Sequence, residues 1–107
     1  MIVKYSVNYS DEALDDLRDI YSYISESLME PTIAAGQVNR IRTEIKALDR
    51  LPFRHSVVDW EPWHTMEMRH FPVDNFVVFY LVEDKSVNVV RIFYGRRDIE
   101  SIIKNSK

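Results

Sequence analysis

The sequence predicts a single α+β domain over residues 1–107, of order β-α-α-β-β-β-α, with a helical hairpin packed on a largely antiparallel four-stranded sheet and a short C-terminal helix. Three observations lead to this fold class. Two amphipathic helical patterns follow one another between residues 11 and 50, with only a short link. Three strand-like segments with turn-like links follow between residues 65 and 94. The length of 107 residues, 46% of them hydrophobic, suits one core.

The first two elements are a strand and a helix. Residues 2–9 alternate, which indicates a strand, and Ser10 is a suitable N-cap for the helix that follows. Asp11 and Glu12 then lie in the first helical turn, where acidic groups interact favourably with the helix dipole. Apolar residues step by three and four through residues 11–28, at Leu14, Leu17, Tyr21, Ile24 and Leu28.

A second amphipathic helix begins near Pro31, which suits a first helical turn, and ends near Arg50 before Pro52. Its apolar positions are Ala34, Val38, Ile41, Ile45 and Leu48. Because the link between the two helices is short, they are expected to pack as an antiparallel hairpin.

The second half of the chain reads as a loop and an antiparallel meander. Residues 51–64 hold two prolines and three large aromatics and predict a structured loop. Strands are predicted at residues 65–71, 76–82 and 87–94, joined by the turn-like "PVDN" and "EDKS". After Gly95, Ile99, Ile102 and Ile103 recur at helical spacing and predict the terminal helix.

Charge is unevenly distributed along a chain whose net charge is −3. Proteins that bind a nucleic acid backbone mainly through electrostatic attraction usually have a net positive charge. A nucleic-acid-binding protein of this kind is therefore disfavoured. Residues 10–30 contain a single basic residue, Arg18, and seven acidic ones: Asp11, Glu12, Asp15, Asp16, Asp19, Glu26 and Glu30. Residues 91–107 form a local basic patch, with Arg91, Arg96, Arg97, Lys104 and Lys107 against Asp98 and Glu100.

Several kinds of chemistry and location are not expected. The chain has no cysteine, no membrane-length apolar run and no signal-peptide core, so we expect a cytoplasmic protein without disulfides. His55, His64 and His70 lack metal-ligand spacing, so no metal site is predicted. Two isolated glycines make no phosphate-binding loop, and no cofactor is expected.

Arg69 and Arg91 lie within predicted strands and each allows two interpretations. Arg69 could stabilise an anionic transition state or pair with a neighbouring acid, and alternation places His70 on the opposite face. Arg91 is expected on one face with Val87, Val89 and Phe93, so it needs an acidic partner on the first helix or an outlet to a groove.

Two further pairs are candidates for contacts. Trp60 and Trp63 could anchor a partner, although pinning the loop over the sheet is the favoured interpretation. Arg96 and Arg97 follow the last strand and could bind phosphates or acidic side chains, or pair with the neighbouring acids.

The order of elements, together with "MRHFPVDNFVVFYLVEDKSVNVVRIFYGRRDI", resembles the RelE/ParE superfamily of type II toxin–antitoxin toxins. The resemblance covers nearly the whole chain. Its most specific parts are Arg69 opening the meander, the interior strand "NFVVFYLV", and "VVRIFYGRRDI" closing it. The superfamily implies two activities on one fold: RelE-like members are ribosome-dependent mRNA endonucleases, whereas ParE-like members inhibit DNA gyrase.

Details of the resemblance favour the ParE-like branch. Against the nuclease pattern, Arg69 matches and Tyr94 falls near the histidine or tyrosine that ends the last strand, but Val77 stands where many nucleases have an arginine. The lysines of a RelE-type site are missing before the meander. Against the ParE-like ending, Gly95, Arg97 and Asp98 fit, while Tyr94 replaces a histidine.

The resemblance therefore implies a toxin that binds a macromolecular target, gyrase by analogy, and is neutralised by a cognate antitoxin, with which it forms an oligomer. The antitoxin would cover the helical hairpin and the basic sheet face. The expected contact residues are Arg69, Arg91, Arg96, Arg97, Trp60 and Trp63. One alternative is a ribosome-dependent endoribonuclease using Arg69, His70, Tyr94 and Arg96, with Arg97 or Glu67 as further candidates. Another is a non-toxic homologue that only binds antitoxin.

Overall fold

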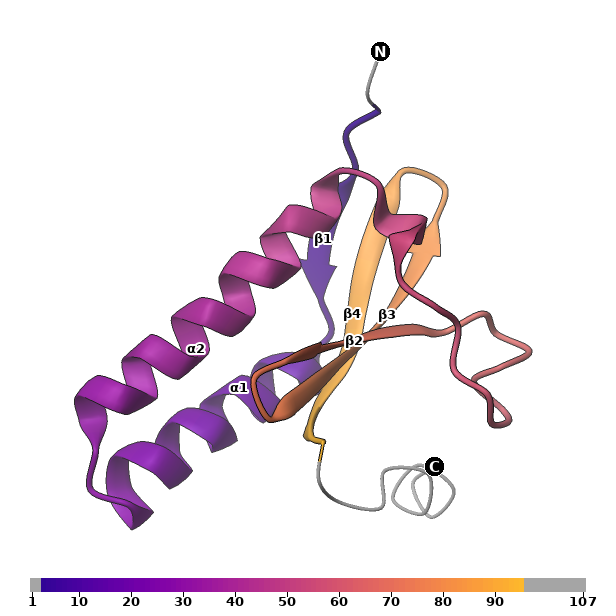
Figure 1. Ribbon diagram of the computed structural model, residues 1–107. Helices are drawn as coiled ribbons and strands as arrows, with labels where there is room; N and C mark the ends of the chain where they lie inside the picture. The colour runs from indigo at the N-terminus through magenta and orange to yellow at the C-terminus, as the bar shows by residue number, and fades with distance from the viewer. Residues whose placement is uncertain (1–2, 96–107) are drawn as a thin grey trace.

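The computed structural model describes residues 3–95, so the predicted C-terminal helix, with Arg96 and Arg97, lies outside the described residues. Its helices and strands are β1 (Ser6–Tyr9), α1 (Asp11–Ser22), α2 (Pro31–Lys46), β2 (Arg69–Val73), β3 (Phe76–Glu83) and β4 (Ser86–Tyr94). The sheet order is β1-β4-β3-β2; β1 runs parallel to β4, and the other neighbours are antiparallel. The predicted α+β class, with a helical hairpin on a largely antiparallel sheet, is confirmed (Figure 1).

The helical hairpin begins at a side-chain cap and turns through an irregular tip. The Ser10 hydroxyl oxygen accepts a hydrogen bond from the Ala13 amide at 3.0 Å, as the N-cap prediction requires. The predicted helix over residues 11–28 is regular only as far as Ser22, because Tyr23–Ser27 form a π-helical turn. The second helix ends at Lys46 and is followed directly by a 3₁₀ turn over Ala47–Asp49. The predicted end near Arg50 corresponds to the end of this turn.

The sheet separates two apolar clusters. The larger lies between the sheet and the two helices, which share one side of the sheet in Figure 1; Leu17, Ile41 and Tyr80 are among its buried members. The smaller cluster is built on Val58, Met68 and Phe79. Its members include loop residues, so the long segment between α2 and β2 serves as a second cover for the sheet.

The predicted start of the second strand was wrong by four residues. Residues 61–67 form turns, and Glu67 has a left-handed backbone with φ of 60°. The ladder with β3 begins only at Arg69, opposite Tyr80, and continues to Val73. The polar residues Thr65 and Glu67 therefore belong to the end of the loop, whereas Met68 is buried in the smaller cluster. The first strand is also shorter than predicted, because pairing with β4 starts at Ser6.

A β-bulge in β4 overturns the expected placement of Arg91. Phe79 pairs with Arg91 but Tyr80 pairs with Val89, so Val90 is an extra residue in β4. Val87 and Val89 pack toward the helices, whereas Phe93 packs in the smaller cluster. Arg91 lies beside Phe93, with its guanidinium carbon 4.4 Å from that ring centre, and does not share a face with Val87 and Val89.

Candidate functional site

Arg69 holds the segment after α2 against β2. Its Nη1 donates to the carbonyl oxygens of Phe53 at 3.1 Å and His55 at 2.5 Å. Its guanidinium carbon lies 5.1 Å from the centre of the Phe53 ring. Hydrogen bonds from a charged donor are among the stronger ones in proteins. The side chain therefore has an internal structural role, whatever else it contacts.

The residues around Arg69 form a packed polar and aromatic cluster. The buried Tyr80 donates its hydroxyl to the Pro52 carbonyl at 2.6 Å, and burial raises the pKa of Tyr80 to about 12. His55 stacks on Phe71 with ring centres 4.5 Å apart. Burial lowers the pKa of His55, and neighbouring Arg54 adds to the shift, which favours the neutral imidazole at neutral pH.

His70 faces the smaller cluster, on the opposite side of the sheet from Arg69. Its ring stacks on Phe79, with centres 6.1 Å apart, and its Nδ1 lies 3.1 Å from the Ser56 carbonyl oxygen. Phe79 also contacts the two loop tryptophans, with ring-centre distances of 6.4 Å to Trp60 and 4.9 Å to Trp63. Both indoles are half-buried between the loop and the sheet, so each has only part of its surface free for a partner.

Tyr94 lies at the far end of the sheet from Arg69. It pairs across β3 with Phe76, and the two rings meet edge to face at 5.7 Å. Arg69 pairs with Tyr80, four residues further along β3. At about 3.3 Å per residue, the two positions are separated by roughly 13 Å along the strands. The predicted nuclease residues Arg69, His70 and Tyr94 are therefore not brought together.

Arg91 meets an acid of the first helix, which was one of its two predicted outcomes. Its Nε and Nη2 donate to the two carboxylate oxygens of Asp16 at 2.9 and 3.0 Å. Asp16 Oδ2 also accepts a hydrogen bond from the Ile92 amide at 2.9 Å. β1 ends at Tyr9, opposite Val89, so among the described residues no strand pairs with Ile92 on the β1 side of β4. The carboxylate there takes the place of a strand carbonyl. The hydrogen bonds that Arg91 donates to Asp16 raise the pKa of Arg91.

A groove of about 640 Å³ opens at the Tyr94 end of the sheet. It is lined from the helical hairpin by Asp19, Ile20, Tyr23, Ile24, Leu28 and Gln37, and from the sheet end by Asn75, Phe76 and Tyr94. We call it the tip groove. Tyr23, Leu28 and Tyr94 keep 59%, 51% and 46% of their surface exposed, which is unusual for apolar side chains gathered in one place. A smaller groove of about 280 Å³ lies between α1 and α2 and is lined by Leu14, Leu17, Arg18, Tyr21, Val38 and Arg42. We call it the helix groove.

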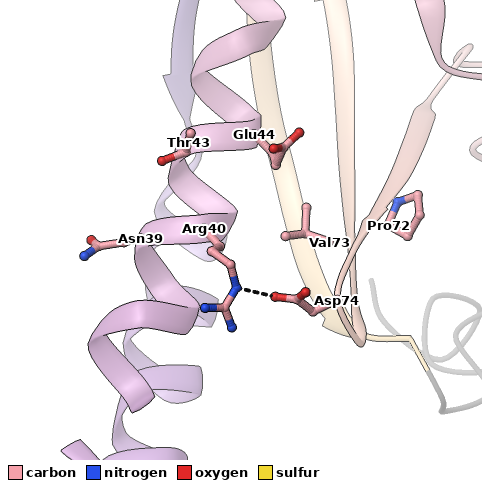
Figure 2. Close-up of a pocket in the computed structure, with 7 residues that line it drawn as sticks. All are labelled: Asn39, Arg40, Thr43, Glu44, Pro72, Val73 and Asp74. Carbon is pink, nitrogen blue, oxygen red and sulfur yellow. Dashed lines mark hydrogen bonds and ion pairs between the residues drawn. The ribbon is translucent and has the colours of Figure 1, made fainter. Parts of the chain in front are cut away.

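A third hollow, between α2 and the β2–β3 turn, is held by polar contacts (Figure 2). Arg40 Nε and Gln37 Nε2 both donate to Asp74 Oδ2, at 2.8 and 2.9 Å. These two bonds lower the pKa of Asp74. Glu44 lines the same hollow, so its charges are mixed and it offers no concentrated positive site.

The described residues offer neither a metal site nor a membrane span. Within residues 3–95 no three histidine or acidic side chains come close enough to hold a metal ion. In the same part of the chain, no helix has both the length and the apolar character needed to cross a bilayer.

Sequence reasoning missed the tip groove. Ile24 and Leu28 were predicted on one face of a regular helix with Tyr21, and Tyr23 was not part of that pattern. The π-helical turn over Tyr23–Ser27 changes the directions of these side chains. The neighbouring Met29, at φ of 57°, ends the helix and is 79% exposed. The adjacent apolar pair Leu28-Met29, next to Pro31, was the available sign that an apolar surface stays open at this tip.

Comparison with known proteins finds a matching family model and several similar solved structures. The family model described as ParE toxin of type II toxin–antitoxin system, parDE, matches residues 7–99. A chain of the chromosomal ParDE toxin–antitoxin system from P. aeruginosa is similar in structure, with a TM-score of 0.71 and 22% identity over 85% of this chain and 96% of that one. The comparison with curated proteins gave no match.

Two further solved structures share the fold at lower identity. A chain of the toxin–antitoxin complex RelBE2 from Mycobacterium tuberculosis has a TM-score of 0.60 and 19% identity, over 86% of this chain and 92% of that one. A conserved hypothetical protein from Helicobacter pylori has a TM-score of 0.54 and 16% identity, over 87% and 97%. The two-layer arrangement of helical hairpin and sheet is therefore common to both of these neighbours.

Proposed function

The chain belongs to the ParE toxin family of type II toxin–antitoxin systems, and we propose that it inhibits a macromolecular target by binding, with DNA gyrase as the target by analogy. It is a RelE/ParE superfamily toxin, so two modes of action are open to the fold: blocking a target, or cutting mRNA on the ribosome. The arrangement of the described side chains supports the first.

The observation that carries this proposal is the separation of the candidate nuclease residues. Acid-base catalysis needs its groups within hydrogen-bond reach of one reacting site. Arg69 and His70 face opposite sides of the sheet, and Tyr94 lies roughly 13 Å further along the strands. Arg69 also donates to two backbone carbonyls. A protein that acts by binding does not need these side chains to meet at one site.

Arg96 and Arg97 are the first target-contact residues to test. Arg69 and Arg91 also stay in the proposal, but both contribute hydrogen bonds to the fold, so replacing them changes stability as well as any contact. Trp60 and Trp63 would contribute only through the exposed part of each half-buried ring. Paired arginines suit bidentate contacts with carboxylates or phosphates.

A supercoiling and relaxation assay with purified protein and gyrase tests the mode of action. We expect inhibition that falls strongly in Arg96→Ala/Arg97→Ala, with Lys85→Ala as the matched control for loss of an exposed positive charge near the other end of the sheet. Full gyrase activity at saturating protein would contradict the proposal. Codon-specific mRNA cleavage on ribosomes, abolished in a folded Arg69→Lys variant, would favour the nuclease alternative instead.

We further propose that a cognate antitoxin covers the helix groove. Leu14, Leu17 and Val38 give it an apolar lining, and Arg42 of α2 adds a basic group, whereas Arg18 of α1 is paired with Asp15. An amphipathic helix with an acidic flank toward α2 fits this combination. Two of the similar solved structures are of toxin–antitoxin systems, which supports an antitoxin as the partner.

Co-purification with the product of the adjacent gene tests this partner. We expect recovery of a complex that Val38→Glu weakens, because a carboxylate would enter the apolar lining and face an acidic helix. Thr32→Glu, an exposed change near the start of the same helix, is the control for added negative charge. Recovery of no partner with the unmodified protein would contradict the antitoxin proposal.

A further inference from the structure

The tip groove presents apolar surface that no described residue covers. Its apolar lining includes Leu28 from the hairpin and Phe76 and Tyr94 from the sheet end, and it has about 640 Å³ of space. Leu28 and Tyr94 are each about half exposed. A contiguous apolar surface of this kind on a small domain calls for an occupant. The occupant is constrained by where the groove lies and by the charge of its walls.

The chain itself arrives at the mouth of this groove. Tyr94, the last residue of β4, lines the groove, and the next residue, Gly95, donates its amide to the Asn75 carbonyl at 2.7 Å. A Cβ added to Gly95 would lie 2.8 Å from Val77 Cγ2, so the backbone passes the sheet end too closely for a larger residue. Residues 96–107 therefore start from a fixed point beside the groove.

The sequence of this segment matches the groove in apolar character and in charge. Ile99, Ile102 and Ile103 would form one apolar stripe if residues 96–107 were helical, and a helix of that length spans about 18 Å. The segment carries four basic residues, Arg96, Arg97, Lys104 and Lys107, against Asp98 and Glu100. Asp19 of α1 lines the groove, and residues 10–30 carry seven acids, of which Asp15 and Asp16 are paired with Arg18 and Arg91.

We propose that residues 96–107 dock in the tip groove of their own chain as an amphipathic helix, with Ile99, Ile102 and Ile103 against Leu28, Phe76 and Tyr94. The docking buries apolar surface on both sides and places basic residues beside an acidic hairpin. It also fixes Arg96 and Arg97 at the end of the sheet. The inference rests on the groove and the sequence of the segment, and it goes beyond the proposed function.

Paramagnetic broadening in the full-length protein tests the docking. The chain has no cysteine, so Ser101→Cys provides a unique site for a spin label. In a helix, position 101 points away from the isoleucine stripe, so the label leaves the contact free. We expect broadening of the Ile20, Ile24 and Leu28 methyl signals. The methyl signals of Val58 and Leu81, in the cluster on the other face of the sheet, should stay sharp.

Paired variants make the result specific. Leu28→Lys should abolish the broadening, because it puts a cation against a basic segment, whereas Leu28→Met should retain it; Leu28 is half exposed, so neither change creates a cavity in the core. Broadening that persists in Leu28→Lys, that is absent in the parent protein, or that falls on Val58 and Leu81 would overturn the proposal. So would broadening seen only when a labelled chain is mixed with an unlabelled one, since that would assign the groove to a second copy.

Discussion

The two ends of the sheet differ in how they are closed. At the Arg69 end, the guanidinium and the Tyr80 hydroxyl donate to the carbonyls of the segment after α2, and the buried aromatic rings pack beneath them. At the Tyr94 end, the strands finish beside the tip groove, and apolar rings remain half exposed. One end is closed by hydrogen bonds within the described chain, whereas the other has apolar surface available for contact. The residues at the Arg69 end therefore maintain the fold, whereas those at the Tyr94 end are free to contact another segment or a partner.

The largest effect is expected where β4 approaches the open end. Asp16→Ala removes both bonds to Arg91 and the acceptor of the Ile92 amide, leaving a half-buried charge without its partner. We expect the free energy of unfolding to fall by about 3 kcal/mol, as for breaking a buried ion pair. Denaturant unfolding measures it. Asp15→Ala, one position earlier and exposed, is the matched control, and a loss for Asp16→Ala no greater than the control's would show that the pair does not secure this end.

A smaller loss is expected at the closed end. Arg69→Ala removes the charged donor to Phe53 and His55, and we expect the free energy of unfolding to fall by about 2 kcal/mol. Arg69→Lys should recover part of it, because one ammonium can still reach a carbonyl but lacks the planar fork. Amide hydrogen exchange would locate the change: protection of the Val58 amide should fall more than that of Val87. Equal changes at both sites would mean that Arg69 does not hold this segment specifically.

The Tyr80 hydroxyl gives the closed end a distinctive alkaline pH dependence. The pKa of Tyr80 is raised to about 12 in the folded protein, above the ordinary value of 10.0. The unfolded chain therefore loses this proton first, so the contribution of Tyr80 to stability is fully present below pH 10 and is lost as the pH rises from 10 to 12. Tyr80→Phe should lack this component, and at pH 7 it should lose about 1 kcal/mol with the bond to Pro52.

Unfolding of both proteins between pH 7 and pH 12 measures the difference. The remaining tyrosines are common to both chains and cancel in the comparison. A stability difference between parent and Tyr80→Phe that does not change above pH 10 would contradict the buried, hydrogen-bonded state of this hydroxyl.

The smallest effect is expected at the ion pair of Figure 2. Arg40 and Asp74 are both exposed, and exposed ion pairs contribute little because water and salt screen them. Asp74→Asn should leave the unfolding midpoint close to that of the parent protein, and added salt should remove what difference remains. A loss as large as that of Asp16→Ala would mean that the β2–β3 turn depends on this contact, and that exposure is a poor guide here.

The fold was predictable because its periodic patterns are clear, whereas the site depended on local irregularities. Ser10 and Pro31 mark helix starts by general capping preferences, and both hold. The face of Arg91 was mispredicted because the bulge at Val90 leaves no signature in alternation. The separation of Arg69 from Tyr94 depends on strand register, which alternation alone does not fix. An acid of the first helix was one of two predicted outcomes for Arg91, the other being an outlet to a groove, and the choice of Asp16 required the structure.

The bulged residue has a consequence for how this family of chains can change length. If Val90 were deleted, Val87, Val89 and Ile92 would still face the helices, because the remaining residues alternate regularly. Deletion of this one residue would therefore leave the alternation of apolar positions unchanged. It would still remove the Val90 carbonyl, which accepts the Ser10 hydroxyl at 2.8 Å and so ties the start of α1 to β4. A chain without this residue would keep the apolar pattern but lose this tie between α1 and β4.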